Sequence, residues 1–314
     1  MWAPLARPFT PLKPTRLLTT ASLATLILIW GTTWAAIRVG LRGIPPILGV
    51  SLRFAIASAV LLALVPVLGI KLGGSRTERR LWLVNGLLTF AIPYGVLYWA
   101  EQWVPSGLAA VLFATFPLLT TVIAHFVLPG ERLTGRAIAG ALAGFAGVAV
   151  IFSEDFHALG GAKVATAAAF LLISPLSAAL GGVAVKRWGA GIHPVSTAAV
   201  PMGLTALLMG TLSLVLDSGH HATFSTPSIL ALLYLAICGS ALPFTLYFWL
   251  LQHQTATRMS LVNYVTPVIA VTVGTLFLDE PFTMRIVAGA ALVILGVAVV
   301  MAKPAPEPAR SERP

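Results

Sequence analysis

The amino-acid sequence predicts an all-α polytopic membrane protein with ten transmembrane helices, built as two inverted five-helix repeats around a central cavity. Three observations lead to this fold class. Hydrophobic residues make up 58% of the chain and charged residues only 10%, whereas an average soluble domain is about 25% charged. So few charges could not cover a surface that faces water. The other two observations are a series of ten apolar segments and an internal similarity between the two halves of the chain.

The ten apolar segments follow one another with short connections. Most approach the ~20 residues that a helix needs to cross a hydrocarbon core ~30 Å thick. None shows the strict alternation typical of a transmembrane β-strand. The predicted spans are residues 18–38, 46–69, 81–101, 105–128, 135–152, 163–185, 194–216, 226–250, 257–278 and 284–302. The segments 135–152 and 284–302 are shorter, so a fused or re-entrant pair stays open as an alternative.

The distribution of cations predicts the orientation in the membrane. If the N-terminus is cytoplasmic, fifteen Lys and Arg residues lie on the cytoplasmic side and four on the opposite side. An excess of cations marks cytoplasmic loops. We therefore expect a multi-pass protein of the cell inner (plasma) membrane, with cytoplasmic tails at residues 1–17 and 303–314. These flanking cations account for the net charge of +10, so we expect no nucleic-acid partner.

An internal similarity divides the chain into two halves. The stretch IPYGVLYWAEQ from Ile92 aligns with LPFTLYFWLLQ from Leu242. The matched pairs are Pro93 with Pro243, Trp99 with Trp249, Gln102 with Gln252, Pro117 with Pro267 and Glu131 with Glu280. Five spans in each copy is an odd number, so the second copy enters the membrane from the opposite side, as in transporters that work by alternating access. We expect the first repeat at 18–152, a linker at 153–162 and the second repeat at 163–302.

Four longer stretches carry a family likeness. They are WGTTWAAIRVGL (30–41), LRFAIAS (52–58), SGLAAVLFATFPLLTTVIAHFVLPGERLTG (106–135) and RMSLVNYVTPVIAVTVGTLFLDEP (258–281). With them the chain resembles the EamA family of the drug/metabolite transporter superfamily over nearly its whole length. Within that family it looks most like the YddG-type amino-acid exporters. The resemblance implies a ten-helix basket with a central cavity, and export of amino acids or related metabolites.

Polar and aromatic residues at mid-membrane depth are the candidates for a substrate site. They are Trp30, Thr33, Tyr94, Tyr98, Thr115, Ser174, Ser177, Phe244, Tyr247, Asn263 and Tyr264. Ordinary helix packing is the alternative for the hydroxyl residues, and anchoring at the interface is the alternative for some aromatic residues. Aromatic faces with few hydrogen-bonding groups and little fixed charge suit a small amphipathic zwitterion better than a phosphate ester. We assign no catalytic residue, no metal ligand and no cofactor.

Four prolines fall near the middle of their spans and form two matched pairs, Pro93 with Pro243 and Pro117 with Pro267. Each removes a backbone donor and frees a carbonyl, so the pairs are candidate hinges, with a packed kink as the alternative.

Arg53 lies roughly 10 Å below the outer end of its span. We expect it to snorkel toward the interface or to form a structural ion pair, with contact to a substrate carboxylate as the alternative.

A transporter is the function that this organisation favours, with an intramembrane enzyme such as a protease, or a non-saturating channel, as alternatives. All ten acidic residues lie at span ends, loops or tails and no HExxH motif occurs, so the side chains of an intramembrane protease are largely missing. The central thirds of the spans contain no Asp or Glu. We therefore expect facilitated diffusion or exchange, with proton transfer by Glu101 as the alternative. The expected partners are a small-molecule substrate and the lipid bilayer; a monomer is favoured, although the sequence leaves the oligomeric state open.

Overall fold

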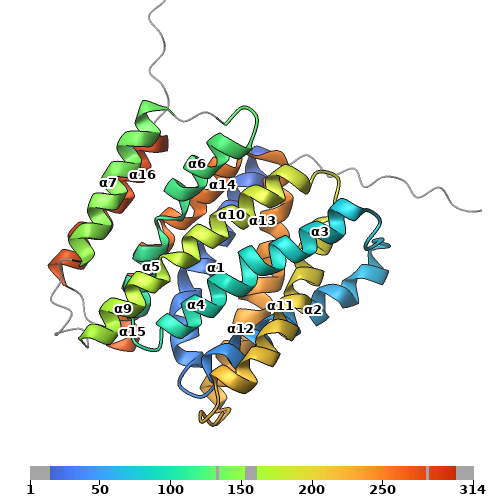
Figure 1. The fold of residues 1–314 in the computed structure, drawn as a ribbon, viewed down its shortest axis with the longest axis horizontal. Coiled ribbons are helices and arrows are strands. Elements are labelled where there is room, and N and C mark those ends of the chain that lie inside the picture. The colour runs from blue at the N-terminus through green and yellow to red at the C-terminus, as the bar shows by residue number, and fades with distance from the viewer. Residues whose placement is uncertain (1–14, 132–133, 153–160, 281–282, 302–314) are drawn as a thin grey trace, which may run out of the picture.

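The computed structural model describes residues 15–131, 134–152, 161–280 and 283–301, and within these ranges every regular element is a helix (Figure 1). Most of the two predicted tails and of the predicted linker therefore lies outside the described residues.

The first half of the chain forms five helical segments, three of them interrupted or shortened. Its elements are α1 (Arg16–Gly40), α2 (Pro46–Val67), α3 (Arg76–Asn85), η1 (Gly86–Ala91), α4 (Ile92–Ala100), α5 (Ser106–Phe113), α6 (Phe116–Val127) and α7 (Gly135–Phe152). The elements of the second half are α9 (Ala162–Leu171), α10 (Ile173–Trp188), α11 (Pro194–Leu216), α12 (Thr226–Ala236), η2 (Ile237–Ala241), α13 (Leu242–His253), α14 (Ala256–Ser260), η3 (Leu261–Tyr264), α15 (Thr266–Leu278) and α16 (Met284–Met301).

All ten predicted segments are helical where the structure describes them. Among the described residues, seven helical stretches are long and apolar enough to cross a membrane: Arg16–Gly40, Pro46–Val67, Arg76–Ala100, Ser106–Val127, Ala162–Trp188, Pro194–Leu216 and Thr226–His253. The other three are shorter apolar helices at Ile138–Ile151, Thr266–Leu278 and Met284–Gly296. The molecule is thus an all-helical, multi-pass membrane protein, and the full set of ten spans stays a prediction.

Matched helix breaks divide four of these segments. In the third and eighth segments, the π-helical turns η1 and η2 come directly before the helices in which Pro93 and Pro243 are the second residue. In the fourth segment, a turn at 114–115 separates α5 from α6, where Pro117 is the second residue. In the ninth, the 3₁₀ turn η3 precedes α15 and Pro267. A proline near the start of a helix loses no intrahelical hydrogen bond, so each predicted kink has become the start of a new helix.

Two helix pairs frame the bundle. α2 packs against α11, while α7 packs against α16 at one edge of the molecule (Figure 1). Glycine allows the second pair to approach closely. A Cβ added at Gly147 would collide with the carbonyl oxygen of Gly289, and one added at Gly296 would collide with that of Gly140.

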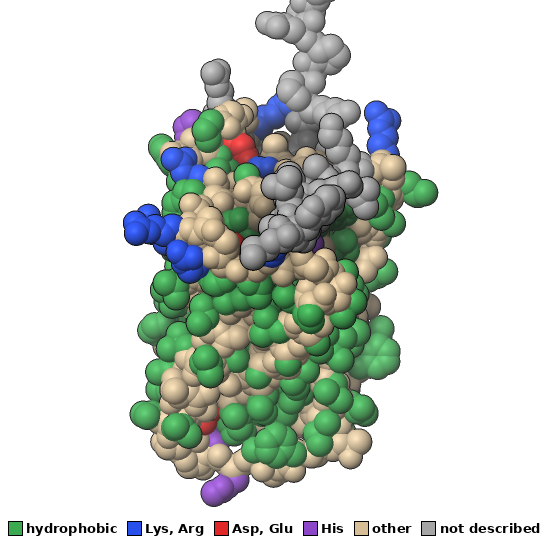
Figure 2. Space-filling model, turned by 90° about the vertical axis from the view of Figure 1, so that its right-hand side faces the viewer, with side chains coloured by type: hydrophobic (Ala, Val, Ile, Leu, Met, Phe, Trp, Pro, Cys, Tyr) green, Lys and Arg blue, Asp and Glu red, His purple; other side chains and the backbone are tan. Residues whose placement is uncertain are grey.

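The outer surface has the character expected of a membrane protein. Figure 2 shows a broad hydrophobic belt and, at its upper end, the Lys and Arg side chains of this face. This uneven distribution agrees with the cation count from the sequence.

Candidate functional site

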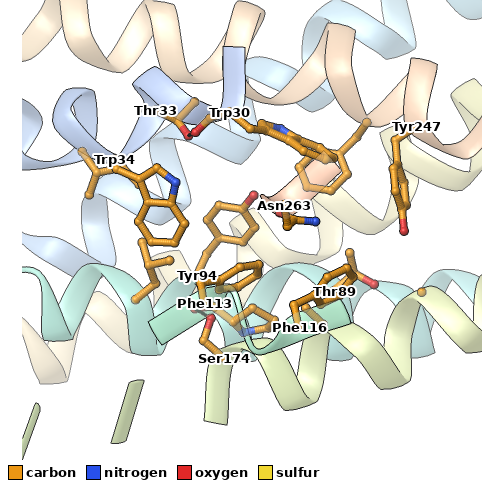
Figure 3. Close-up of a pocket in the computed structure, with 16 residues that line it drawn as sticks. Trp30, Thr33, Trp34, Thr89, Tyr94, Phe113, Phe116, Ser174, Tyr247 and Asn263 are labelled. Carbon is orange, nitrogen blue, oxygen red and sulfur yellow. Dashed lines mark hydrogen bonds between the residues drawn. The ribbon is translucent and has the colours of Figure 1, made fainter. Parts of the chain in front are cut away.

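A small cavity lies in the centre of the bundle, between the two halves of the chain (Figure 3). Its volume is about 80 Å³, which is room for several water molecules. Residues from α1, η1, α4, α5 and α6 in the first half face residues from α10, α13 and η3 in the second. No charged residue is among the described residues that line it.

Aromatic side chains form most of the wall. The Trp30 ring lies 5.3 Å from the Phe244 ring and 5.6 Å from the Tyr247 ring, measured between centroids. On the other side, the Trp34 ring meets the Phe113 ring edge-on at 5.5 Å. Aromatic pairs in these geometries are favourable beyond the area they bury, so the wall offers well-ordered π-faces to an occupant.

Two polar atoms in this wall have no hydrogen-bond partner. They are Nε1 of Trp30 and Oγ1 of Thr89, and both are buried. Buried polar atoms are normally hydrogen-bonded, and leaving one unpaired costs about 1–3 kcal/mol. The Thr89 hydroxyl lies against α10, where a Cβ added at Gly181 would collide with it.

The cavity brings together seven of the substrate-site candidates. They are Trp30, Thr33, Tyr94, Ser174, Phe244, Tyr247 and Asn263, and the predicted hinge residue Pro93 also lines it. Tyr98, Thr115 and Ser177 do not line it. The hydroxyls of Thr115 and Ser177 donate to the carbonyl oxygens of Leu112 and Leu88. The side chain of Tyr264 lies outside the described residues.

Hydroxyl side chains of neighbouring helices bind backbone carbonyls around the helix break at Pro93. The Pro93 carbonyl accepts a hydrogen bond of 3.0 Å from Ser174, and the Leu88 carbonyl one of 2.9 Å from Ser177. In η1, the Gly86 carbonyl accepts one from Thr205 at 2.9 Å. Hydroxyl side chains of neighbouring helices therefore satisfy the backbone around this break.

Sequence reasoning missed several wall residues, including Thr89, Phe113 and Phe116. Phe113 ends α5 and Phe116 begins α6, directly before Pro117, so the two residues flank the turn that breaks the fourth segment. Aromatic residues on both sides of a predicted mid-membrane break were the available signal for them.

The expectation that Arg53 snorkels was wrong, whereas its expected carboxylate neighbour Glu101 does interact with it electrostatically, without a hydrogen bond. The Arg53 side chain is only 1% exposed, so it does not snorkel. Its guanidinium donates to Ser240 Oγ at 2.7 Å, to the Gly239 carbonyl at 3.1 Å and to the Tyr98 hydroxyl at 3.3 Å. Both carboxylate oxygens of the fully buried Glu101 lack any hydrogen-bond partner, so the two residues do not form a hydrogen-bonded ion pair.

Two carboxylates cap helices of the opposite half. Glu280, which follows α15, accepts hydrogen bonds at the start of α5 from the Ser106 N–H (2.8 Å), the Ser106 hydroxyl (2.9 Å) and the Gly107 N–H (3.0 Å). Glu131, which follows α6, accepts bonds at the start of α14 from the N–H groups of Ala256 (2.9 Å) and Thr257 (3.2 Å) and from the Thr257 hydroxyl (2.6 Å). The first N–H groups of a helix have no acceptor within it and favour negative charge. The fourth and ninth segments are thus tied to each other at both ends.

The second and seventh segments are tied in a related way. Asp217, which follows α11, accepts hydrogen bonds from the Leu48 N–H (2.7 Å) and the Ile47 N–H (3.4 Å) at the start of α2. At the start of α11, Nδ1 of His193 accepts a bond from the Val195 N–H at 3.2 Å. This nitrogen can accept only in the neutral imidazole, and burial lowers the pKa of His193 below its usual value.

Comparison with known proteins now decides the family. The model of the EamA-like transporter family matches residues 19–153 and again residues 165–302. This chain belongs to that family. The two matches fit the two-repeat layout of the EamA fold, and membership of a transporter family excludes the intramembrane protease as an alternative.

Individual relatives agree with this assignment. The uncharacterized inner membrane transporter YedA of Escherichia coli is 32% identical over 81% of this chain and 81% of its own length. The uncharacterized transporter YoaV of Bacillus subtilis is 28% identical over 86% of this chain and 92% of its own. A solved crystal structure has the same fold, with a TM-score of 0.68 at 23% identity, over 90% of this chain and 96% of its own. The EamA chain described here is therefore a membrane transporter.

Proposed function

We propose that this EamA transporter exports amino acids, or related small metabolites, by alternating access. The observation that carries the proposal is the central cavity, which both halves line with aromatic faces and with a few polar residues, Thr33, Thr89, Ser174 and Asn263. Aromatic walls suit the apolar part of a small amphipathic solute, and a few placed polar groups orient its polar part. Aromatic or other apolar amino acids have this combination.

Alternating access needs a gate at each end of the cavity, and the two carboxylate caps supply candidates. Glu131 and Glu280 hold opposite ends of the same pair of segments. Each of these segments is broken near its middle, ahead of Pro117 or Pro267. Release of one cap would let the helical pieces at that end tilt while the other cap stays closed. The four matched prolines are the hinges in this scheme.

The same scheme defines the topology. Ten spans, inverted repeats at 18–152 and 163–302, a linker at 153–162 and both tails in the cytoplasm place the Glu131 end inside and the Glu280 end outside. An impermeant thiol reagent applied to intact cells tests this, with single cysteines placed in either tail after Cys238→Ala removes the native thiol. Reaction of a tail cysteine from outside would overturn the topology.

Facilitated diffusion or exchange is the coupling that we propose. No acidic residue lines the cavity among the described residues, whereas a proton-driven carrier usually alternates the exposure of a titratable group within the membrane. The solute's own gradient would then drive export.

Flux into liposomes that contain the purified protein tests the function. A panel of amino acids and small metabolites is offered with and without unlabelled solute inside. Saturable uptake that internal solute accelerates would support a carrier, and a non-saturating conductance would instead identify a channel. Saturable uptake of other metabolites only, with no amino acid carried, would overturn the substrate class.

A further inference from the structure

Arg53 is a buried cation whose hydrogen bonds among the described residues all go to neutral groups. It lies in α2, is 1% exposed, and gives hydrogen bonds to a serine hydroxyl, a tyrosine hydroxyl and a backbone carbonyl, all of them neutral. A charge removed from water is costly unless an opposite charge and hydrogen bonds replace its hydration. Arg53 has some of these hydrogen bonds, but no oppositely charged group among the described residues is hydrogen-bonded to it.

The guanidinium also keeps donor capacity in reserve. An arginine side chain has five N–H donors, and one each on Nε, Nη1 and Nη2 is used among the described residues. The Tyr94 side chain also hydrogen-bonds to the guanidinium, which leaves at most one N–H without an acceptor among the described residues. A carboxylate presents two oxygens and is the acceptor that this fork recognises best.

Tyr94 places this cation next to the cavity. Its ring lies over the guanidinium, with the Arg53 Cζ 4.6 Å from the ring centroid, and the same residue lines the cavity (Figure 3). The Tyr94 ring also meets the Phe54 ring edge-on at 5.0 Å. One aromatic ring thus lies between a buried positive charge and the space where we place the substrate. The attraction between a cation and a ring face is weaker than a charged hydrogen-bonded pair.

We propose that Arg53 binds the carboxylate of the transported solute, which reaches the guanidinium when the Tyr94 ring moves aside. This inference rests on the proposed function and narrows its substrate class to solutes that carry a carboxylate. The aromatic wall around Trp30 and Phe244 then holds the apolar part of the solute. The bound carboxylate supplies the hydrogen-bonded anion that Arg53 lacks among the described residues.

Glu101 is the competing explanation for Arg53. The two residues interact electrostatically, so Arg53 could serve only to balance that carboxyl group. Both oxygens of Glu101 are without a hydrogen bond, which argues against a bonded pair. Replacing Glu101 separates the two roles, because it removes the carboxyl group and leaves the guanidinium in place.

The test uses four related ligands and the full chain in detergent. L-phenylalanine carries both an ammonium group and a carboxylate. L-phenylalaninamide has a neutral amide in place of the carboxylate, and phenethylamine has no group at that position. Phenylpropionate keeps the carboxylate and lacks the amine. Quenching of tryptophan fluorescence reports binding, because Trp30 and Trp34 line the cavity. We expect the wild type to bind phenylalanine about tenfold or more tightly than its amide.

Three variants then show which residue causes the tighter binding of phenylalanine. In Arg53→Gln the ratio between phenylalanine and its amide falls to about one, and in Arg53→Lys it falls part-way, because the charge stays and the fork is lost. In Glu101→Gln the ratio is unchanged. A ratio that persists in both Arg53 variants, or that Glu101→Gln abolishes, would overturn the inference. If Arg53→Gln does not fold, the affinity ratio measured in Arg53→Lys alone decides whether the inference holds.

The ligand series also separates this inference from the proposed function. Equal affinity of the wild type for phenylalanine and its amide would overturn the carboxylate role and leave amino-acid transport standing. Binding of phenylpropionate without binding of any amino acid would overturn amino-acid transport and support the carboxylate role. Failure of all four ligands to bind counts against both.

Discussion

Glu131 and Glu280 make matching caps at opposite ends of the fourth and ninth segments, but different charges surround them. Glu131 interacts electrostatically with Lys186, whose ammonium group donates to the carbonyls of Leu251 and Gln254. Glu280 interacts with Glu101, a buried second carboxyl group whose oxygens have no hydrogen-bond partner among the described residues and which also interacts with Arg38 and Arg53. The caps made by Glu131 and Glu280 therefore have similar hydrogen bonds, but the charged groups around the two carboxylates differ.

This difference indicates that the two ends open with different ease. A nearby cation stabilises a capping carboxylate, while a nearby carboxyl group, when ionised, repels it. The Glu131 end should be the more firmly closed of the two. A duplicated fold can in this way supply two gates of one design, which substitutions at neighbouring positions then adjust separately.

Removing the caps should have the largest effect. Glu280→Ala or Glu131→Ala leaves buried N–H donors without an acceptor, so we expect a loss of about 2–3 kcal/mol in the free energy of unfolding. Thermal or denaturant unfolding in detergent measures it. A cysteine at Ser174 in the Cys238→Ala background reports which end opens, because Ser174 lines the cavity. Each cap variant should raise labelling from its own side only, and equal rises from both sides would contradict the gating role.

Changing the neighbouring charges should have a smaller effect of opposite sign at the two ends. Glu101→Gln removes the ionisable neighbour of Glu280 and should lower labelling from that side about two- to fivefold, while Lys186→Met should raise labelling from the Glu131 side by a similar factor. The same Glu101→Gln protein tests coupling in vesicles with an imposed pH gradient. Uphill accumulation in the wild type that this variant abolishes would show that Glu101 carries a proton, and facilitated transport would be wrong.

The cavity allows the two halves of the chain to be compared at one depth. Tyr94 comes from the first half and Asn263 from the second, and both line the cavity. Replacing either by Ala should raise the half-saturation concentration for transport up to about tenfold, because each removes contact area or a hydrogen-bonding group. Thr272→Ala is a matched control, since that exposed hydroxyl donates only to Val268 of its own helix. Unchanged kinetics in both cavity variants would remove these residues from the site.

The smallest effect concerns the caps of α2 and α11. Burial lowers the pKa of His193 from its usual 6.5, so the unfolded chain takes up a proton more readily than the folded chain does. The stability that His193 contributes is therefore complete above pH 6.5 and is lost as the pH falls through the lower folded pKa. The loss should be about 0.5 kcal/mol or less, because the residue is only half-buried. In His193→Asn, which keeps an N-cap that does not titrate in this range, the unfolding midpoint should depend less on pH between neutral and mildly acidic conditions.

The helical fold and its two-part organisation could be predicted because they depend on local composition. An apolar segment of this length can satisfy its backbone in the membrane only as a helix, and all ten predicted segments are helical where described. The matched prolines located the helix breaks for the same local reason. Cavity residues such as Trp30 and Asn263 were found because an aromatic or amide group at mid-depth is unusual.

The partners of the polar groups could not be predicted in this way. Ser174 and Ser177 are the same residue type on the same face of α10, and both hydroxyls donate to carbonyls of the third segment, yet only Ser174 lines the cavity, since Ser177 lies about 4.5 Å further along the helix. The repeat revealed Glu131 and Glu280 as a pair, but not that each caps the other half. The inverted topology could have predicted these caps, because it places the end of the fourth segment beside the start of the ninth.

The sequence by itself determined that this chain lies in a membrane, that it is helical and that it is a duplicated EamA transporter, because hydropathy and motif order are properties of the chain alone. Only the tertiary structure decided where the charges go. Arg53 and Glu101, expected as a pair or at the interface, are both buried without a bonded counterion. Electrostatic energies depend on distances between side chains that lie far apart in the sequence, and those distances exist only once the helices have packed.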